Sequence, residues 1–458
     1  MLFSSLVFLW IFLPLVLILY RLLPGRGKNA LLLVASLFFY AWGEPVYILL
    51  MLASITLNYL GGLLLDGREG AARKLCLALV VAVNLALLGY YKYYSFAGDT
   101  LAALLGRQVL PVRDIALPLG ISFYTFQAMS YVIDLYRRRI GVQKSWFLLA
   151  LYISFFPQLV AGPIVRYTEV EAQLRRRTTT LDGFTYGIKR FLYGLAKKVI
   201  LANCFAARAD EVFGLDPSQV STPLAWLGAL YYTLQIYYDF SGYSDMAIGL
   251  GAMFGFTFPE NFNYPYLSRT VSEFWRRWHM TLSGWFREYV YIPLGGNRKG
   301  LKRQIFNLFV VELLTGIWHG ANWNFICWGL YYFVLLAVEK LFLLPHLQKG
   351  RVWPHIYTLF LVVVGWAMFV GNDTGVSFGL LFHKLFVPSG GVSPLYFLRN
   401  YGVLLVVSIL CCTPLIEKIW NLLKKNAVTR CAAILALLVV STAYVVGSTN
   451  SPFLYFNF

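Results

Sequence analysis

Charged residues are scarce in this sequence. They make up 13% of the 458 residues, whereas 59% of the residues are hydrophobic, and the mean hydropathy is +0.63. So little charge cannot cover the surface of a water-soluble domain of this length. The chain is therefore predicted to be an all-α, polytopic membrane protein.

Several catalytic and nucleotide-binding motifs are also missing. The sequence contains no GxxxxGK[ST], GxSxG, HExxH or GxGxxG pattern, which argues against an ATP-driven pump, a serine hydrolase and a zinc protease. Its six cysteines form no CxxC pair and mostly fall within apolar runs. They are interpreted as small hydrophobic residues, so they predict neither a metal site nor a disulfide framework. No permanently bound cofactor is expected.

Apolar runs follow one another along the whole chain. The first run lacks a basic leader and a small-residue cleavage site, so it is predicted to be a retained span. Several runs are shorter than the length that a span needs, so we expect roughly eleven crossings. The candidate spans are 3–20, 29–43, 46–65, 73–92, 115–136, 146–165, 184–206, 223–255, 305–320, 322–342, 356–372, 398–420 and 429–447, with 29–65 forming a helical hairpin around Gly43, Glu44 and Pro45.

Basic residues are concentrated in the short loops between these runs. The net charge of +18 could suggest binding to nucleic acid, but the positive-inside rule explains it better. Loops that face the cytoplasm carry an excess of Lys and Arg, which would place both chain termini on the outer side. The basic loops are 21–28, 66–74, 137–144, 166–190, 343–351 and 424–430.

His319 lies deep in an apolar part of the stretch 268–324. The run from Ile305 to Trp318 leads into it, and apolar residues resume soon after it. An ionisable side chain at such a depth is costly and is often functional, although it could also be a neutral core histidine. If the helix continued past His319, Thr315 and Asn322 would share its face and could orient the ring. Trp318 and Trp323 flank the same position.

His279 belongs to a more polar segment. Apolar and aromatic residues between Val271 and Tyr289 form one stripe of a helical wheel, with charged residues opposite. This pattern predicts an amphipathic surface helix with His279 at the edge of its apolar stripe. The histidine can be a catalytic group or a structural hydrogen bonder. Basic residues in and after the helix can attract a polyanionic ligand or lipid headgroups; they are Arg276, Arg277, Arg287, Arg298, Lys299, Lys302 and Arg303.

Polar residues interrupt three other runs. Tyr238, Asp239 and Asp245 lie around Gly242 in an otherwise apolar segment, which predicts a broken or cavity-lining helix. The run 115–136 has a similar polar streak. Gln158, Gly162 and Pro163 break the run 146–165, which is predicted to be re-entrant. The streak in 115–136 consists of Gly120, Ser122, Gln127 and Asp134.

These motifs together resemble the membrane-bound O-acyltransferase (MBOAT) superfamily, especially its bacterial polysaccharide O-acetyltransferase branch of the AlgI and PatA type. The D-alanyl transferases of teichoic acid are similar through RWHMTLSGWFR, whereas YIPLGGNRKG after it resembles the O-acetyltransferase branch. Glu288 is a small departure from the pattern of this family, in which Asp is expected at this position as often as Glu. The matching segments are 38–43, 118–137, 155–166, 237–251, 274–300, 316–329 and 453–458.

The resemblance implies a fold and a site. It implies a single membrane domain over 1–458, with N-terminal helices in 1–113, a catalytic core in 114–342 and C-terminal helices in 343–458. Its helices would enclose a central tunnel. By motif, the catalytic histidine corresponds to His319, and a second position, His or Asn in different branches, corresponds to His279.

The resemblance also implies a reaction. Acetyl-CoA would donate an acetyl group from the cytoplasm, a buried histidine would act as general base, and a polysaccharide such as alginate would be modified outside through an extracytoplasmic SGNH-type protein. A D-alanyl or lysophospholipid acyltransferase is an alternative. A transporter that moves an acyl group or lipid-linked sugar without chemistry is another, because polar, broken helices also suit transport.

The distribution of basic loops makes a topology prediction. We expect a cysteine placed at Phe458 to react with a membrane-impermeant reagent added outside intact cells, and a cysteine at Lys299 to stay unlabelled, because basic loops face the cytoplasm. The reverse labelling pattern would refute the orientation.

Overall fold

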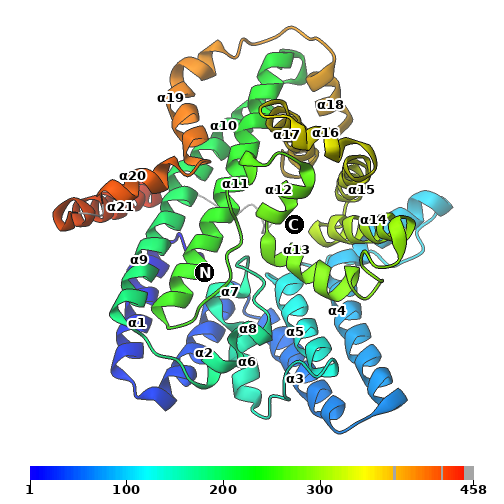
Figure 1. The fold of residues 1–458 in the computed structure, drawn as a ribbon, viewed down its shortest axis with the longest axis vertical. Coiled ribbons are helices and arrows are strands. Elements are labelled where there is room, and N and C mark those ends of the chain that lie inside the picture. The colour runs from blue at the N-terminus through cyan, green and yellow to red at the C-terminus, as the bar shows by residue number, and fades with distance from the viewer. Residues whose placement is uncertain (375–377, 424–425, 448–458) are drawn as a thin grey trace. The chain divides into compact units, whose positions relative to one another are not determined.

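The structure, a computed structural model, describes residues 1–374, 378–423 and 426–447. Within these ranges the chain forms helices and connecting turns, with one isolated β-bridge between Val220 and Val392 and no strand (Figure 1). The predicted all-α class is confirmed. The motif 453–458, including Phe458, lies outside the described residues.

The chain divides into two compact units. The first comprises residues 1–191 and 245–259, and the second comprises 192–244 and the residues from 260 onward. The chain leaves the first unit near the end of helix α9 (Leu181–Ala196) and returns to it within α11 (Thr222–Met253). The predicted single domain and its three subdivisions remain a prediction.

The first unit contains the N-terminal helices and a returning segment of the chain. Tyr20 and Arg177 both donate hydrogen bonds to the carbonyl of Phe254, at 2.7 and 3.0 Å, which ties the segment 245–259 into this unit. The predicted hairpin is confirmed as α2 and α3. The elements are η1 (Phe8–Phe12), α1 (Leu13–Leu22), α2 (Gly25–Ala41), α3 (Tyr47–Asp66), α4 (Gly70–Leu105), α5 (Ile121–Tyr136), α6 (Trp146–Ser154), α7 (Phe156–Leu159), α8 (Tyr167–Arg175) and most of α9.

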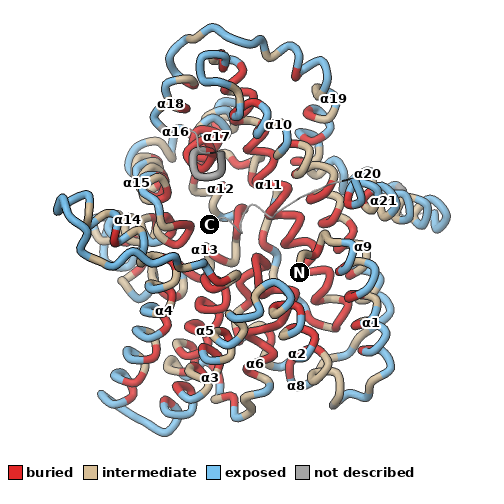
Figure 2. The backbone as a smooth tube through the Cα atoms, turned by 180° about the vertical axis from the view of Figure 1, so that it is seen from behind, coloured by how far each residue is buried: buried red, intermediate tan, exposed pale blue. Residues whose placement is uncertain are grey.

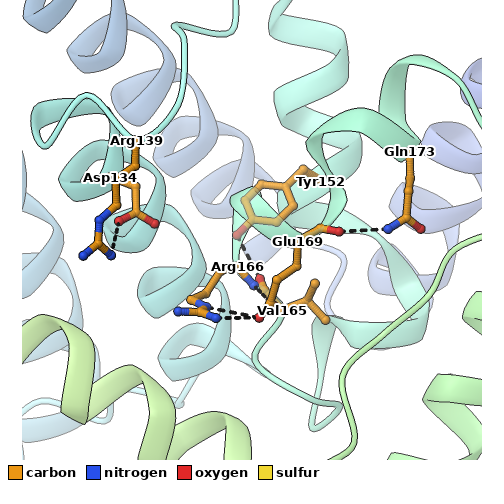
Figure 3. Close-up of polar contacts among 7 residues, drawn as sticks. All are labelled: Asp134, Arg139, Tyr152, Val165, Arg166, Glu169 and Gln173. Atoms are coloured by element: carbon orange, nitrogen blue, oxygen red, sulfur yellow. Dashed lines mark hydrogen bonds and ion pairs between the residues drawn. The ribbon is translucent and has the colours of Figure 1, made fainter.

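Polar side chains in α5 to α8 are held by local contacts (Figure 3). Asp134 pairs with Arg139 at 3.6 Å, and Arg166 pairs with Glu169 at 2.8 Å at the start of α8. Tyr152 donates to the carbonyl of Val165 at 2.9 Å. The run 146–165 is broken as predicted, but the first break lies at Phe155, between α6 and α7, and Gln158 is inside α7. Gly162 and Pro163 follow the end of α7.

The second unit contains the helices that carry both histidines of interest. Its elements are η2 (Lys197–Ala202), α10 (Asn203–Phe213), η3 (Pro217–Gln219), the first part of α11, η4 (Pro265–Leu267), α12 (Val271–Arg277), α13 (Met280–Phe286), η5 (Arg287–Tyr291), α14 (Gly300–His319), α15 (Trp323–Val338), η6 (Glu339–Leu343), α16 (Leu344–Lys349), α17 (Trp353–Thr374), α18 (Phe378–Phe386), α19 (Leu395–Cys411), α20 (Leu415–Leu423) and α21 (Ala427–Gly447).

Membrane-spanning helices are present in both units. Among the described residues, five helices are long and apolar enough to cross a membrane, and α19 with α20, bent by 83°, forms a sixth candidate. Only 22% of the apolar window in α4 and 11% of that in α21 are buried (Figure 2), as expected for lipid-facing helices. The predicted number of about eleven crossings remains a prediction. The five helices are Tyr47–Asp66, Gly70–Leu105, Trp323–Lys349, Trp353–Val370 and Ala427–Gly447.

Helix α11 is continuous, so the prediction of a broken helix around Gly242 is wrong, whereas the alternative of a cavity-lining helix stays a prediction. Asp239 forms a buried ion pair with Lys198 in the second unit, and Asp245 pairs with Arg190 at 2.7 Å in the first. These partners compensate the carboxylates without unwinding the backbone. Gly242 instead permits close packing, because a Cβ there would lie 2.7 Å from the carbonyl oxygen of Gly194.

Helices α14 and α15 form a hairpin whose axes approach closely at two glycines. A Cβ on Gly316 would lie 2.4 Å from the carbonyl oxygen of Phe325, and a Cβ on Gly329 would lie 2.4 Å from that of Glu312. Only a hydrogen atom fits at either place. The hairpin therefore fixes the end of α14, where His319 lies, against α15.

The close approach makes a stability prediction. We expect Gly329→Ala to lower the midpoint of thermal unfolding in detergent, because the new methyl group must push two backbones apart. The expected decrease in the free energy of unfolding is about 1–3 kcal/mol. Gly402→Ala in α19 is the matched control, since nothing lies within 4 Å of a Cβ there. Equal midpoints for the two variants would contradict the proposed role of Gly329.

Candidate active site

The second unit brings His279 and His319 to the same indole ring. The ring centroid of Trp318 lies 6.1 Å from that of His279 and 5.1 Å from that of His319. The two histidines are only 2% and 4% exposed. Two ionisable rings that are 40 positions apart in sequence thus share one buried neighbourhood, which is typical of a functional site.

His319 is enclosed by aromatic rings from α15 and α17. Its imidazole makes edge-to-face contacts with Trp328 at 5.0 Å and Phe369 at 5.4 Å between centroids. Phe325 stacks at 6.5 Å. Such contacts restrict the plane of the imidazole ring, so His319 is held in one orientation at the end of α14.

His279 occupies a break between α12 and α13. Its backbone is left-handed, with φ 42° and ψ 54°, a conformation that costs a residue with a side chain about 1–3 kcal/mol. The prediction of one amphipathic helix through this position is therefore wrong. Trp278 is extended and His279 is left-handed, so neither residue has the backbone conformation of an α-helix.

Asn261 organises the hydrogen bonds around His279. Its Oδ1 lies 3.0 Å from His279 Nδ1 and accepts from Thr281 N–H at 3.2 Å and from the Thr281 hydroxyl at 2.9 Å. Its Nδ2 donates to Ser244 Oγ at 3.0 Å. Phe240 packs against the imidazole edge to face, with centroids 4.6 Å apart.

Burial controls the charge of His279. Desolvation, with a smaller contribution from His319, lowers the pKa of His279 well below its usual value near 6.5. The imidazole is therefore neutral at physiological pH, and one of its two nitrogens can accept a proton or a hydrogen bond.

A carboxylate directly after α15, at the start of η6, anchors α12. Glu339 accepts hydrogen bonds from the backbone N–H groups of Val271 and Ser272, at 2.6 and 3.0 Å, and from the Ser272 hydroxyl at 2.9 Å. A carboxylate at this end satisfies N–H groups that the helix leaves unpaired. The start of α12 is thus fixed to the end of α15.

Comparisons with known proteins show which family the chain belongs to. The model of the membrane-bound O-acyltransferase family matches residues 141–378. The probable alginate O-acetylase AlgI of Azotobacter vinelandii is 46% identical over 82% of this chain and 76% of that protein. The peptidoglycan O-acetyltransferase of Helicobacter pylori is 36% identical over 81% and 77%, and the teichoic acid D-alanyltransferase of Bacillus subtilis is 30% identical over 51% and 61%.

This chain belongs to the membrane-bound O-acyltransferase family. It is a multi-pass membrane enzyme that transfers an acyl group from a donor substrate. The resemblance deduced from the sequence motifs is thereby confirmed, and the alternative of a transporter without chemistry has no support.

Three residues were predicted to surround or orient His319 in this O-acyltransferase. Two of them are exposed, and the third forms a hydrogen bond within α14. Helix α14 ends at His319 and Gly320 is extended, so Asn322 does not share a helical face with the histidine. Asn322 and Trp323 are exposed, and the Asn322 side chain accepts from Asn324 N–H at 3.0 Å at the start of α15. Thr315 is buried and donates to the carbonyl of Val311 at 2.8 Å.

Three polar residues of α11 that the sequence singled out have partners outside the histidine cluster. Tyr238 donates to the carbonyl of Ser408 in α19. Asp239 pairs with Lys198, and Asp245 belongs to the first unit of the O-acyltransferase.

The basic residues predicted to attract the donor are mostly exposed. Arg277 and Arg303 are the exceptions, since both are half-buried. Arg277 pairs with Glu273 at 2.7 Å. Burial raises the pKa of Glu273, but a backbone hydrogen bond from Arg269 and the pairing with Arg277 lower it below its usual value overall. Arg303 donates to the carbonyl of Leu294 at 2.9 Å. The exposed residues are Arg276, Arg287, Arg298, Lys299 and Lys302.

Reasoning from the sequence missed Asn261 and the ring of Phe369. Asn261 precedes His279 by 18 residues and lies in a segment without helical periodicity, so no spacing links the two. Phe369 is one of many phenylalanines in apolar runs. Only the three-dimensional arrangement identifies either residue.

Proposed function

We propose that this enzyme takes an acetyl group from cytoplasmic acetyl-CoA and passes it across the membrane for O-acetylation of an extracellular polysaccharide. The observation that carries the proposal is the pair of buried histidines around Trp318. The names of the relatives that match most of the chain, an alginate O-acetylase and a peptidoglycan O-acetyltransferase, support acetyl as the acyl group and a polysaccharide as the acceptor.

His319 acts as the general base in this proposal. A ring nitrogen takes the proton from the attacking hydroxyl while the hydroxyl oxygen forms a bond to the acetyl carbonyl carbon. The C–S bond of the thioester then breaks, and the departing thiolate of coenzyme A receives that proton. The aromatic rings around His319 keep the imidazole oriented and exclude water from the transfer.

His279 assists as a hydrogen-bond acceptor that positions the reacting groups. Its neutral imidazole borders the same indole as His319, so it can bind a hydroxyl or amide N–H of a substrate. A positioning group contributes less to the rate than the base that moves the proton.

The exposed basic residues in and after α12 attract the donor. Coenzyme A carries several negative phosphate charges, and a cluster of positively charged residues raises the local concentration of such a ligand. Arg276, Arg287, Arg298 and Lys299 are exposed and are the residues we assign to this role, with Arg277 contributing through its local charge.

The acceptor side requires a second protein. Polysaccharides of this class lie outside the cytoplasmic membrane, so we infer that an extracytoplasmic SGNH-type acetyltransferase receives the acetyl group and modifies the polymer. The D-alanyl alternative is less well supported, because that relative matches only about half of the chain. A lysophospholipid acyltransferase is not supported by any of the relatives described above.

The base assignment predicts the effect of removing His319. In membrane vesicles supplied with labelled acetyl-CoA, His319→Ala should reduce acetyl transfer to the polymer by about 10³-fold or more, and His279→Ala by about 10²-fold. His346→Ala is the matched control. His346 is exposed, so its replacement should leave acetyl transfer unchanged. Near-wild-type transfer by a correctly folded His319→Ala protein would make His319 structural.

The donor surface predicts a change in KM. Replacing Arg276 and Arg277 by Glu should raise the apparent KM for acetyl-CoA by about tenfold, with little change in kcat, because the lost attraction acts on the bound ground state. Added salt should weaken donor binding to the wild type more than to the variant.

Two controls separate donor attraction from other effects. Arg399→Glu changes an exposed charge in α19 of the same unit and should leave KM unchanged. Arg276→Glu alone keeps the ion pair between Arg277 and Glu273. It should raise the apparent KM for acetyl-CoA less than the double variant does. A fall in kcat with an unchanged KM would reject the proposed donor surface.

A further inference from the structure

We infer that Asn261 is a positioning residue that holds His279 in a single tautomer, with the proton on Nδ1 and the lone pair on Nε2. The inference rests on the proposed function, because it gives the Nε2 lone pair the task of accepting a hydrogen bond or proton from a substrate group.

The first step concerns the orientation of the Asn261 amide. The backbone N–H of Thr281 can only donate a hydrogen bond, and it points at Asn261 from 3.2 Å. The amide atom that faces it must therefore be the oxygen. The amide nitrogen then faces Ser244 Oγ at 3.0 Å, where a hydroxyl can accept. The two ends of the amide are thus assigned by their partners.

The second step concerns the imidazole. His279 Nδ1 lies 3.0 Å from the same oxygen, and two lone pairs at that distance would repel each other. Nδ1 therefore carries the proton. Because burial keeps the ring neutral, Nε2 carries none and is left with its lone pair.

The third step concerns what the lone pair faces. Nε2 is buried and has no hydrogen-bond partner among the residues that the structure describes. A buried polar atom left unpaired is costly, and such atoms are a feature of binding sites that a ligand completes. The rigid support comes from three elements: the C-terminal half of α11 through Ser244, the loop at Asn261 and the start of α13 through Thr281.

Nitrogen NMR of the full-length protein, labelled with ¹⁵N-histidine in lipid bilayers, tests the tautomer directly. The signals of His279 are identified by their loss in His279→Gln. We expect a protonated Nδ1 and an unprotonated Nε2 in the wild type, and a mixture of both tautomers in Asn261→Leu, which keeps the side-chain size but removes the acceptor. An unchanged single tautomer in Asn261→Leu would overturn the inference.

Two further variants separate tautomer control from simple packing. Asn261→Asp keeps the oxygen acceptor, and Ser244 can donate to the second carboxylate oxygen, so the wild-type tautomer should persist. Thr281→Val removes one donor to Asn261 but leaves the bond to His279, so it should also keep the tautomer. If Asn261→Asp behaves like Asn261→Leu, the acceptor is not what matters and the inference fails.

Kinetics connect the tautomer to turnover. With acetyl-CoA as donor, Asn261→Leu should lower kcat by about tenfold with little change in KM, and Asn261→Asp should recover most of the loss. Wild-type kcat in Asn261→Leu would overturn the positioning role. If His279→Ala itself turns over normally, the assignment of His279 under the proposed function fails, whereas the NMR result still decides whether Asn261 fixes its tautomer.

Discussion

The distance at which α14 and α15 pack against each other governs the geometry of the histidine cluster. Gly316 and Gly329 allow their backbones to meet with no side chain between them. The close approach places the last turn of α14 directly beside α15, so that His319 lies against Trp328. One additional methyl group at the crossing would move the imidazole relative to the rings that orient it, and catalytic geometry tolerates only small displacements.

Aromatic residues and hydrogen bonds have different tasks around the two histidines. His319 is surrounded by the rings of Trp318, Trp328 and Phe369, which fix its plane while offering little polarity. His279 instead depends on Asn261, which fixes both its position and the location of its proton. Two rings of the same chemical type can thus have distinct properties because their neighbours differ.

Hydropathy and motifs predicted the all-α fold class and singled out the two histidines, but they did not predict the backbone around them. Apolar runs predicted the hairpin of α2 and α3 because lipid requires continuous hydrophobic surface. The wheel around His279 assumed a continuous helix, whereas the backbone is extended at Trp278 and left-handed at His279, which separates α12 from α13. Asp239 seemed to interrupt α11, but its partner Lys198 is distant in the sequence and could not be inferred from local patterns. Asn261 was missed for the same reason.

The contact between Glu339 and the start of α12 also sets an order of events during synthesis. Glu339 follows Val271 by 68 residues, so the ribosome must complete α14 and α15 before the carboxylate that satisfies the first N–H groups of α12 exists. Until then the segment carrying His279 can have its amphipathic helices formed but not anchored. The start of α12, eight residues before His279, can therefore be anchored by this contact only after residue 339 has been synthesised.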